Sequence, residues 1–253
     1  MSTTGVGLSP AGLWQLVESG GYQVDLDIWS DLAAETRGQV LDLGCGIGRV
    51  SHHLNRLGHI TTGVDQDPNL IDDFNQTRPS DAPAALTADV TALLHPDSPI
   101  RDRTFNLVIA PQQLLQILGS PEARMTLLQS LAHLTVDQAL LAFAICEELP
   151  EAPIDYPNVS PDLREIDGWV HSSQPISIET GLTEVTAIRR RTSLSPNGQV
   201  SKSLDSVTLE RLSRSTLEGE LAEAGLHPVR AASIPVTDRH MGSTLVVARA
   251  FSP

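Results

Sequence analysis

Three glycines at alternate positions follow an apolar segment early in the chain. The segment VLDLGCGIGRV, residues 40–50, reads as a buried strand that runs into Gly44, Gly46 and Gly48. Because glycine has no Cβ, a ligand can touch the backbone of such a loop directly. The pattern therefore predicts a ligand-binding loop at the end of a strand, and its spacing bears on which ligand it holds.

The spacing of these glycines argues against a dinucleotide and against a phosphate loop. The loop reads G-x-G-x-G, whereas a dinucleotide fingerprint reads G-x-G-x-x-G, and Arg49 stands where the third fingerprint glycine would fall. No Lys-Ser or Lys-Thr pair follows, as a P-loop requires. Asp42 precedes the loop, and its carboxylate would repel a pyrophosphate but suits an ammonium or another cation. A nicotinamide-dependent oxidoreductase is disfavoured for these reasons.

The elements that must position this loop follow a regular order. From about residue 39 to 146, short apolar runs alternate with helical patterns, which predicts βαβ units, a parallel sheet and helices on both faces. Two amphipathic helices precede the first strand, each with one tryptophan, Trp14 or Trp29. We expect this N-terminal segment either to cover the ligand crevice or to pack in the core.

The chain changes character after the fifth predicted strand. Residues 147–161 are acidic and proline-rich, which is typical of an exposed connection, and residues 176–212 favour antiparallel strands. Asn197-Gly198 within that stretch predicts a hairpin turn. A helix follows, for which Ser215 and Glu218 suggest a capping box and Gly225 a C-cap, and two last strands close the chain.

Composition limits the classes of partner. The 253-residue chain has a formal net charge of −14, which disfavours a nucleic-acid partner, and we interpret its longest basic run, residues 189–191, as a solvated strand face. Cys45 and Cys146 form no disulfide framework or metal-ligand spacing, so we expect no metal and a reducing compartment. We find no signal peptide and no run of 18 apolar residues, and expect a cytoplasmic protein without a membrane partner.

The glycine loop and the residues around it resemble a known family. Asp42-x-Gly44-x-Gly46-x-Gly48 is similar to the first motif of the class I S-adenosylmethionine-dependent methyltransferases. The resemblance extends over about residues 22–250 and is strongest over residues 40–120. The later part is similar mainly in layout, to the family's small-molecule N- and O-methyltransferases.

This resemblance implies a fold and a division of the chain. We expect an α/β protein with a Rossmann-like, doubly wound seven-stranded sheet, one strand near its edge being antiparallel. An inserted antiparallel β layer should cover about residues 164–212. Residues 1–36 would form an N-terminal helical cap, and residues 37–253 the methyltransferase domain.

The resemblance also assigns cofactor contacts for S-adenosyl-L-methionine. Asp65, with Gln66 beside it, would accept bonds from the ribose hydroxyls; the alternative is a helix cap, for which Asp67 is the better candidate. Asp89 would meet the adenine amino group and the Val90 N–H a ring nitrogen; the alternative for Asp89 is a plain turn carboxylate. The methionine end would face Asp42, the loop and the end of the fourth strand: Gly44, Cys45, Gly46, Gly48, Ala110 and Pro111. Cys45 itself we interpret as a small filler residue.

Two positions depart from patterns known in the family. Asn106 stands where the family commonly has Asp, and we expect a mild effect because that end of the strand lies away from the ligand. The stretch APQQLLQ, residues 110–116, is not the Asn-Pro-Pro-Tyr type of motif with which DNA-methylating enzymes hold a flipped base. A nucleic-acid substrate is therefore disfavoured a second time.

The acceptor half of the site is less well defined by sequence. Four side chains could remove a proton from an acceptor, although a solvated or structural role is open for each: His171, His240, Glu147 and Glu148. Six could contact the acceptor: Tyr22, Trp29, Gln112, Gln113, Gln116 and Trp169. We expect methyl transfer to an N or O atom of a small molecule. The alternative is a cofactor-binding protein or partner subunit without catalysis, and the oligomeric state stays open.

Overall fold

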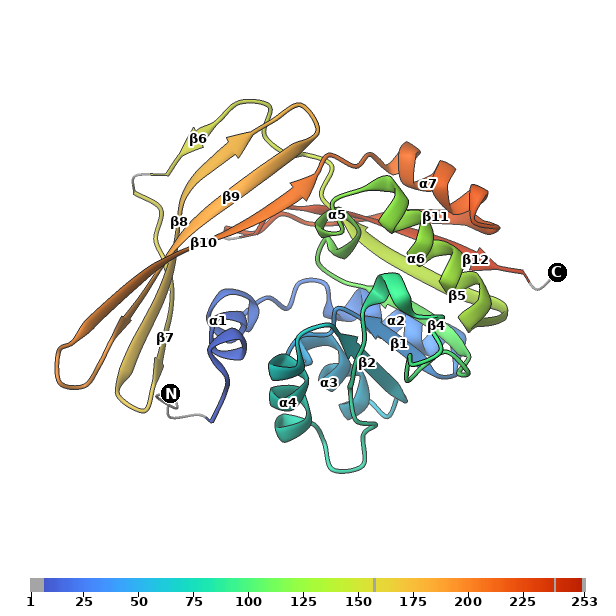
Figure 1. Cartoon of the computed structure of the whole chain (residues 1–253), viewed down its shortest axis with the longest axis horizontal. Helices are drawn as coiled ribbons and strands as arrows, with labels where there is room; N and C mark the ends of the chain where they lie inside the picture. Colours follow the sequence, from blue (N-terminus) through green and yellow to red (C-terminus); the bar gives the residue numbers. More distant parts are fainter. Residues whose placement is uncertain (1–6, 157, 239, 252–253) are drawn as a thin grey trace.

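The protein consists of an α/β body and a large antiparallel sheet that projects from it (Figure 1). The computed structural model describes residues 7–156, 158–238 and 240–251. No helix within these ranges combines the length and apolar character that a bilayer span needs. The two parts face each other across the molecule, and helix α1 (Pro10–Ser19) lies between them.

The body is built on a seven-stranded sheet with the strand order β11-β12-β5-β4-β1-β2-β3. All neighbouring pairs from β5 to β3 are parallel, whereas β12 is antiparallel to both β5 and β11. The expected mostly parallel sheet with one antiparallel strand near its edge is therefore confirmed. Its strands are β1 Val40–Leu43, β2 Thr61–Asp65, β3 Leu86–Thr87, β4 Phe105–Ala110, β5 Thr135–Ile145, β11 Leu226–Ile234 and β12 Ser243–Ala250.

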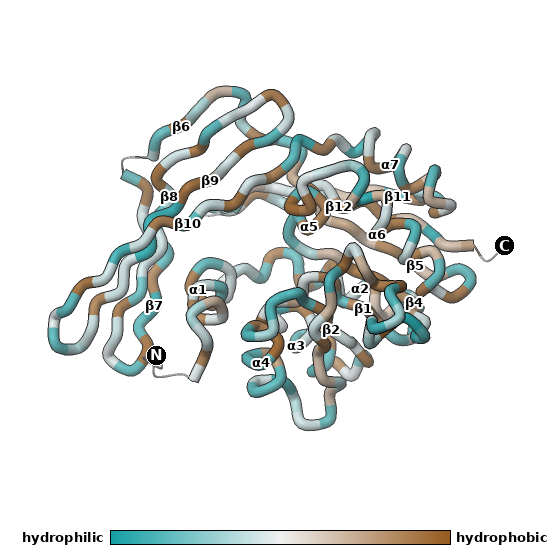
Figure 2. The backbone as a smooth tube through the Cα atoms, in the orientation of Figure 1, coloured by the Kyte–Doolittle hydropathy of each residue, from teal (hydrophilic) through white to brown (hydrophobic). Residues whose placement is uncertain are grey.

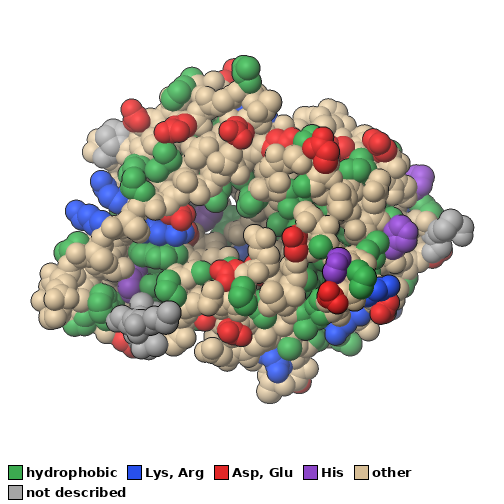
Figure 3. All heavy atoms as spheres, in the orientation of Figure 1, with side chains coloured by type: hydrophobic (Ala, Val, Ile, Leu, Met, Phe, Trp, Pro, Cys, Tyr) green, Lys and Arg blue, Asp and Glu red, His purple; other side chains and the backbone are tan. Residues whose placement is uncertain are grey.

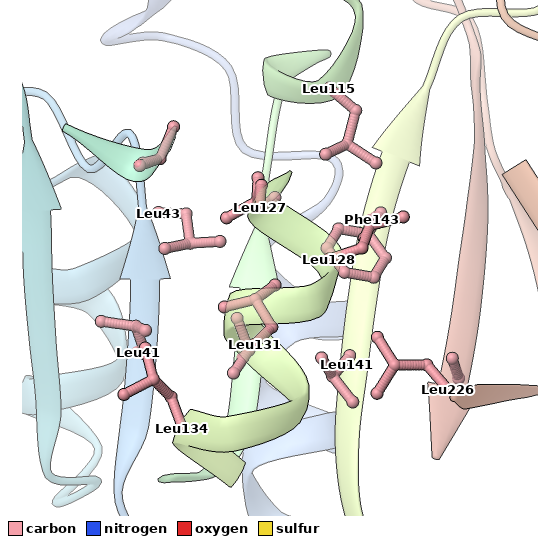
Figure 4. Packing of buried hydrophobic residues seen from close by; sticks show 14 of the residues in the cluster. Leu41, Leu43, Leu115, Leu127, Leu128, Leu131, Leu134, Leu141, Phe143 and Leu226 are labelled. Carbon is pink, nitrogen blue, oxygen red and sulfur yellow. The ribbon is translucent and has the colours of Figure 1, made fainter. Parts of the chain in front are cut away.

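Helices cover both faces of this sheet, because alternate residues of its buried strands point in opposite directions. Leu41 and Leu43 of β1 pack with α6 (Pro121–Leu134) and α7 (Arg214–Glu223), as Figure 4 shows for α6. Val40 belongs to the opposite cluster, with α2 (Leu26–Thr36) and α3 (Arg49–Arg56). The remaining helical segments are α4 Pro68–Thr77, α5 Leu114–Ile117 and the 3-10 turn η1 Val90–Ala92.

The second sheet is the inserted antiparallel layer. Its strand order is β10-β9-β8-β6, with β7 also paired to β8. It begins before the expected residue 164, because β6 and the start of β7 already pair with β8. In Figure 2 brown and teal alternate along these strands, as expected for strands exposed on one face. The strands are β6 Ile154–Asp155, β7 Asp162–Ile166, β8 Trp169–Thr180, β9 Glu184–Leu194 and β10 Val200–Glu210.

Two local signals in the later part of the chain concern a hairpin turn and a helix cap; the first is confirmed and the second is wrong. The turn between β9 and β10 contains Asn197-Gly198 with Gly198 at φ 86°, as the hairpin signal predicted. The capping box at Ser215 was wrong, since the N-cap of α7 is Ser213, whose Oγ accepts the Thr216 N–H at 3.1 Å. Ser213 and Ser215 are both suitable N-cap residues, but the helix begins directly after Ser213.

Candidate active site

The glycine loop lies at the carboxyl end of β1 and leads into α3. Gly44, Gly46 and Gly48 have φ angles of 65°, 53° and 90°, a region that favours glycine. A Cβ on Gly46 would lie 2.1 Å from Oε1 of Gln15, so the Gln15 side chain would have to move to make room for one. The Cys45 N–H donates to the Val64 carbonyl at 3.0 Å, which fixes the loop against β2.

Asp42 is the buried acid behind this loop. The Ser51 Oγ donates to its Oδ2 at 2.6 Å, whereas Oδ1 has no hydrogen-bond partner within the described ranges. Burial raises the pKa of Asp42 to about 7, and the bond from Ser51 lowers it only in part. A buried carboxyl oxygen without a partner is a position at which a bound cationic group would gain an acceptor.

Asp65 connects the end of β2 to the glycine loop. Its Oδ2 accepts the Gly46 N–H at 3.0 Å, and its Oδ1 accepts the Asp67 N–H at 3.0 Å. The side chain is half-buried, and its two oxygens have acceptor capacity beyond these two bonds. Asp67 caps α4 through the Asn69 N–H at 2.9 Å, as its sequence alternative predicted, and Gln66 is exposed.

Asp89 has the geometry of a turn carboxylate. It is exposed, and its Oδ1 accepts bonds from the N–H and the Oγ1 of Thr91, both at 2.8 Å. Val90 behind it is buried and starts η1. These contacts hold the turn after β3 in place and leave its outer face open to solvent.

The segment after β4 has an unusual backbone. Gln112 and Gln113 both have positive φ angles, 60° and 56°, which non-glycine residues rarely adopt. The Gln113 N–H donates to the Ala144 carbonyl at 3.2 Å, and its Nε2 donates to the Ser243 Oγ at 3.0 Å. Two consecutive strained residues at a strand end are typical of a functional site, and here they follow Pro111 beside the glycine loop.

Helix α1 and the start of α2 bring two polar side chains, Gln15 and Asp25, to the loop that the sequence did not indicate. The Ile47 N–H donates to Gln15 Oε1 at 3.1 Å. Arg49 forms a bidentate ion pair with Asp25, at 2.6 and 2.8 Å, and donates to the Tyr22 carbonyl at 3.0 Å. No periodic signal marks these residues, because their proximity depends on where α1 folds back onto the loop.

Four cavities surround this region, and Figure 3 shows the molecule hollowed between the inserted sheet and the body. A glycine-loop cavity of about 50 Å³ lies against Asp42, the loop and Gln112. A central cavity of about 190 Å³ shares Gln112 and continues past Ala144. An entrance cavity of about 530 Å³ and a sheet cavity of about 610 Å³ lie between the body and the inserted sheet.

Three of the acceptor residues and one of the base candidates predicted from the sequence lie at these cavities. Gln112 and Gln113 line the central cavity together with Tyr22 and His240. The rings of Tyr22 and His240 are 4.6 Å apart, and His240 lines the entrance and sheet cavities as well. Burial, and secondly the nearby Asp25, raise the pKa of Tyr22 to about 12, so its hydroxyl stays protonated at neutral pH.

Two other candidates have structural roles. Trp29 is fully buried in the core between α2 and the sheet, and its Nε1 donates to Asp25 at 2.8 Å. Gln116 is also fully buried: its amide donates to the carbonyls of Cys146 and Glu210, and its Oε1 accepts the Cys146 N–H at 2.7 Å. Neither side chain has free surface for an acceptor, so both assignments were wrong.

The remaining candidates do not reach the four cavities. His171 is buried beneath α1, with Nδ1 2.8 Å from the Ser193 Oγ, and burial lowers its pKa; Trp169 stacks on it at 6.1 Å. Glu147 accepts the Arg214 N–H at 2.7 Å and the Thr244 Oγ1 at 2.6 Å. With Glu148 it lines a separate cavity of about 370 Å³. Of the four base candidates, only His240 lies where the main cavities meet.

The departure at Asn106 lies at the opposite end of β4. Its Oδ1 accepts the Gln39 N–H at 3.0 Å, near the start of β1, so the amide joins two strand starts far from the loop. Burial raises the pKa of the Cys45 thiol well above its ordinary value, which agrees with a filler role. Within the described parts of the chain, no group of His, Cys, Asp or Glu side chains is arranged to hold a metal ion.

Comparisons with known proteins agree with this geometry. Residues 40–137 match the model of a family described as a methyltransferase domain. A search of curated proteins found no match. Among solved structures, DesVI of Streptomyces venezuelae is similar in fold, with a TM-score of 0.72 and 19% identity over 97% of this chain and 99% of that one.

Two further solved structures have the same fold. CalS10 from Micromonospora echinaspora, an amino pentose methyltransferase solved with S-adenosylmethionine bound, gives a TM-score of 0.70 at 17% identity, covering 94% of this chain and 96% of that one. KedS8 from Streptoalloteichus sp., a sugar N-methyltransferase, gives a TM-score of 0.71 at 17% identity, covering 95% of this chain and 92% of that one. The match to a methyltransferase domain over residues 40–137 agrees with the strand order of the sheet and with the glycine loop at the end of β1. Over nearly its whole length the chain also shares its fold with solved structures, among them an S-adenosylmethionine-dependent methyltransferase from Clostridium acetobutylicum, with a TM-score of 0.71 at 12% identity over 96% of this chain and 98% of that one.

The residues around the loop fit this cofactor. Asp42 offers a buried carboxyl oxygen without a partner to an ammonium group. The loop offers bare backbone at Gly44 and Gly46 where side chains would block it, and Asp65 offers unused acceptor capacity beside it. An amino acid joined to a ribose carries both kinds of group.

Proposed function

We propose that this enzyme transfers the methyl group of S-adenosylmethionine to an N or O atom of a small molecule. The observation that carries the proposal is the sharing of Gln112 between the glycine-loop cavity and the central cavity. Through His240 the central cavity joins spaces of a few hundred Å³, the size of a small-molecule site. Two neighbours named as amino pentose and sugar N-methyltransferases favour an amine on a sugar-like acceptor.

In this proposal the cofactor lies across the carboxyl ends of β1, β2 and β3. The ribose hydroxyls would be held by Asp65, the adenine end would lie at Asp89 and Val90, and the amino-acid end would face Asp42 and the loop. The bound cofactor supplies a methyl group already activated by its sulfonium. The chain therefore has to align the acceptor and exclude water, which can supply several kcal/mol of the rate enhancement.

The acceptor would be positioned by the two strained glutamines and by Tyr22. His240 is the side chain that could take the proton from an acceptor amine or hydroxyl, since it faces all three larger cavities. Residues 1–36 would act as the helical cap over a domain of residues 37–253, with the inserted layer facing the acceptor. The net charge of −14 supports a partner that is not a nucleic acid.

The proposal is tested in two steps. S-adenosylhomocysteine should raise the melting temperature of the protein, and NAD should not. A screen of small amines and amino sugars, with S-adenosylhomocysteine formation as the readout, should then find an acceptor, and His240→Ala should lower kcat for it. Cofactor binding without turnover on any small acceptor would favour the alternative, a cofactor-binding subunit without catalysis.

A further inference from the structure

Helix α1 contacts three separate parts of the molecule. At its start, the Ser9 N–H donates to both carboxylate oxygens of Asp73 on α4, at 3.0 and 3.1 Å. In its middle, Gln15 accepts the Ile47 N–H of the glycine loop. Near its end, Glu18 binds the inserted sheet. The helix therefore links the cofactor half of the site to the acceptor half.

Gln15 covers the part of the loop that lacks side chains. The 2.1 Å distance from a Cβ on Gly46 to Gln15 Oε1 means that the amide lies directly against the bare backbone. The cavity that remains there is about 50 Å³, far smaller than the central cavity of about 190 Å³. Gln15 and Ser19 of α1 line this space, so a shift of α1 would widen it.

The hydrogen bonds between Glu18 and the inserted sheet resist such a shift. Arg191 of β9 donates to its two oxygens at 2.7 and 2.9 Å, and Ser173 of β8 donates at 2.7 Å. Burial opposes ionisation of Glu18, but these bonds outweigh it and hold its pKa below the ordinary value. The Arg191 guanidinium also lies 5.3 Å from the ring of Trp14 on the same helix. The sequence predicted a solvent-exposed Arg191, but its side chain binds Glu18 of α1. Arg189 also forms ion pairs, with Asp162 and with Glu18.

We propose that α1 is a latch over the cofactor site, in which Gln15 is a positioning residue at the glycine loop and the Glu18–Arg191 contact limits the rate of opening. This inference rests on the proposed function. Gln15 and Glu18 are three residues apart on one helix and share a face, so release of Glu18 frees Gln15. Glu18 also lines the entrance cavity, so an acceptor seated there rests against the closed latch.

The rates of S-adenosylhomocysteine binding test the latch without an acceptor. Stopped-flow tryptophan fluorescence on the full chain should show association and dissociation both about tenfold faster in Glu18→Gln and in Arg191→Gln than in the wild type. The double variant should be no faster than the faster single variant, since both remove one contact. Glu35→Gln, which breaks an exposed ion pair with Arg230, is the matched control and should leave both rates unchanged.

A second pair of variants tests Gln15 itself. Gln15→Ala should weaken S-adenosylhomocysteine binding about fivefold through faster dissociation, and Gln129→Ala on the exposed face of α6 should not. Wild-type rates in both Glu18→Gln and Arg191→Gln, or multiplied effects in the double variant, would overturn the latch alone. A folded wild-type chain that binds no S-adenosylhomocysteine would overturn the proposed function, and the latch with it.

Discussion

Replacement of Asp42 by asparagine should make the protein more stable, and increasingly so as the pH rises. Asp42 is buried, with Ser51 its hydrogen-bond donor, and burial raises its pKa from 3.8 to about 7. Because the folded pKa exceeds the unfolded one, the stability that the protonated carboxyl contributes is fully present below pH 3.8. It is lost as the pH rises through about 7. Asparagine keeps an acceptor for Ser51 and does not ionise.

The size of the effect follows from the difference between the two pKa values. At 1.36 kcal/mol per unit, a rise from 3.8 to about 7 corresponds to about 4 kcal/mol between the protonated and the ionised limits. About 1 kcal/mol of this has already been lost at pH 4.5. The free energy of unfolding of Asp42→Asn minus that of the wild type should therefore grow by about 3 kcal/mol between pH 4.5 and pH 8.

Urea unfolding of both proteins at several pH values, without ligand, measures this difference directly. Ser51→Ala supplies the matched test, since loss of the donor that favours the ionised carboxylate should make the fall in stability with pH steeper. A difference between Asp42→Asn and wild type that stays constant within about 1 kcal/mol across this pH range would refute the reasoning. Burial would then not raise the pKa of Asp42 in the protein without cofactor.

Three further predictions concern the loop and the core. Asp65→Ala should weaken S-adenosylhomocysteine binding by about 2–3 kcal/mol, or about 30- to 150-fold in calorimetry, whereas Asp67→Ala should leave affinity nearly unchanged; the reverse order would disprove the ribose placement. Gly46→Ala, with φ 53° and a Cβ 2.1 Å from Gln15, should cost more than tenfold in the same titration, and wild-type affinity would contradict it. Arg124→Met should lower the free energy of unfolding by about 3–5 kcal/mol in urea, because it leaves two glutamates without their buried partner; a loss under about 1 kcal/mol would argue against that account.

The glycine loop, the order of strands and helices and the inserted layer could be predicted from the sequence, because each depends on local patterns. A strand that ends in alternate glycines has few other conformations open to it, and Gly44, Gly46 and Gly48 all have positive φ angles. Asp42 lies on β1 and Asp65 ends β2, and these two strands are parallel neighbours. Their closeness to the loop therefore follows from the order of elements in a parallel sheet. The same local logic failed at Ser215, where two serines competed for one cap.

The acceptor side of the site was decided only by tertiary structure. Trp29 and Gln116 were chosen for residue type and position in the chain, but the packing of α2 and the junction of α5 with β5 and β10 bury both completely. Gln15 and Glu18 carry no local signal, yet the path of α1 brings one to the glycine loop and the other to Arg191. Hydrophobic periodicity determines which face of a helix is buried, but not which distant segment its polar side chains meet. That depends on long-range packing, which the sequence specifies only through the whole fold.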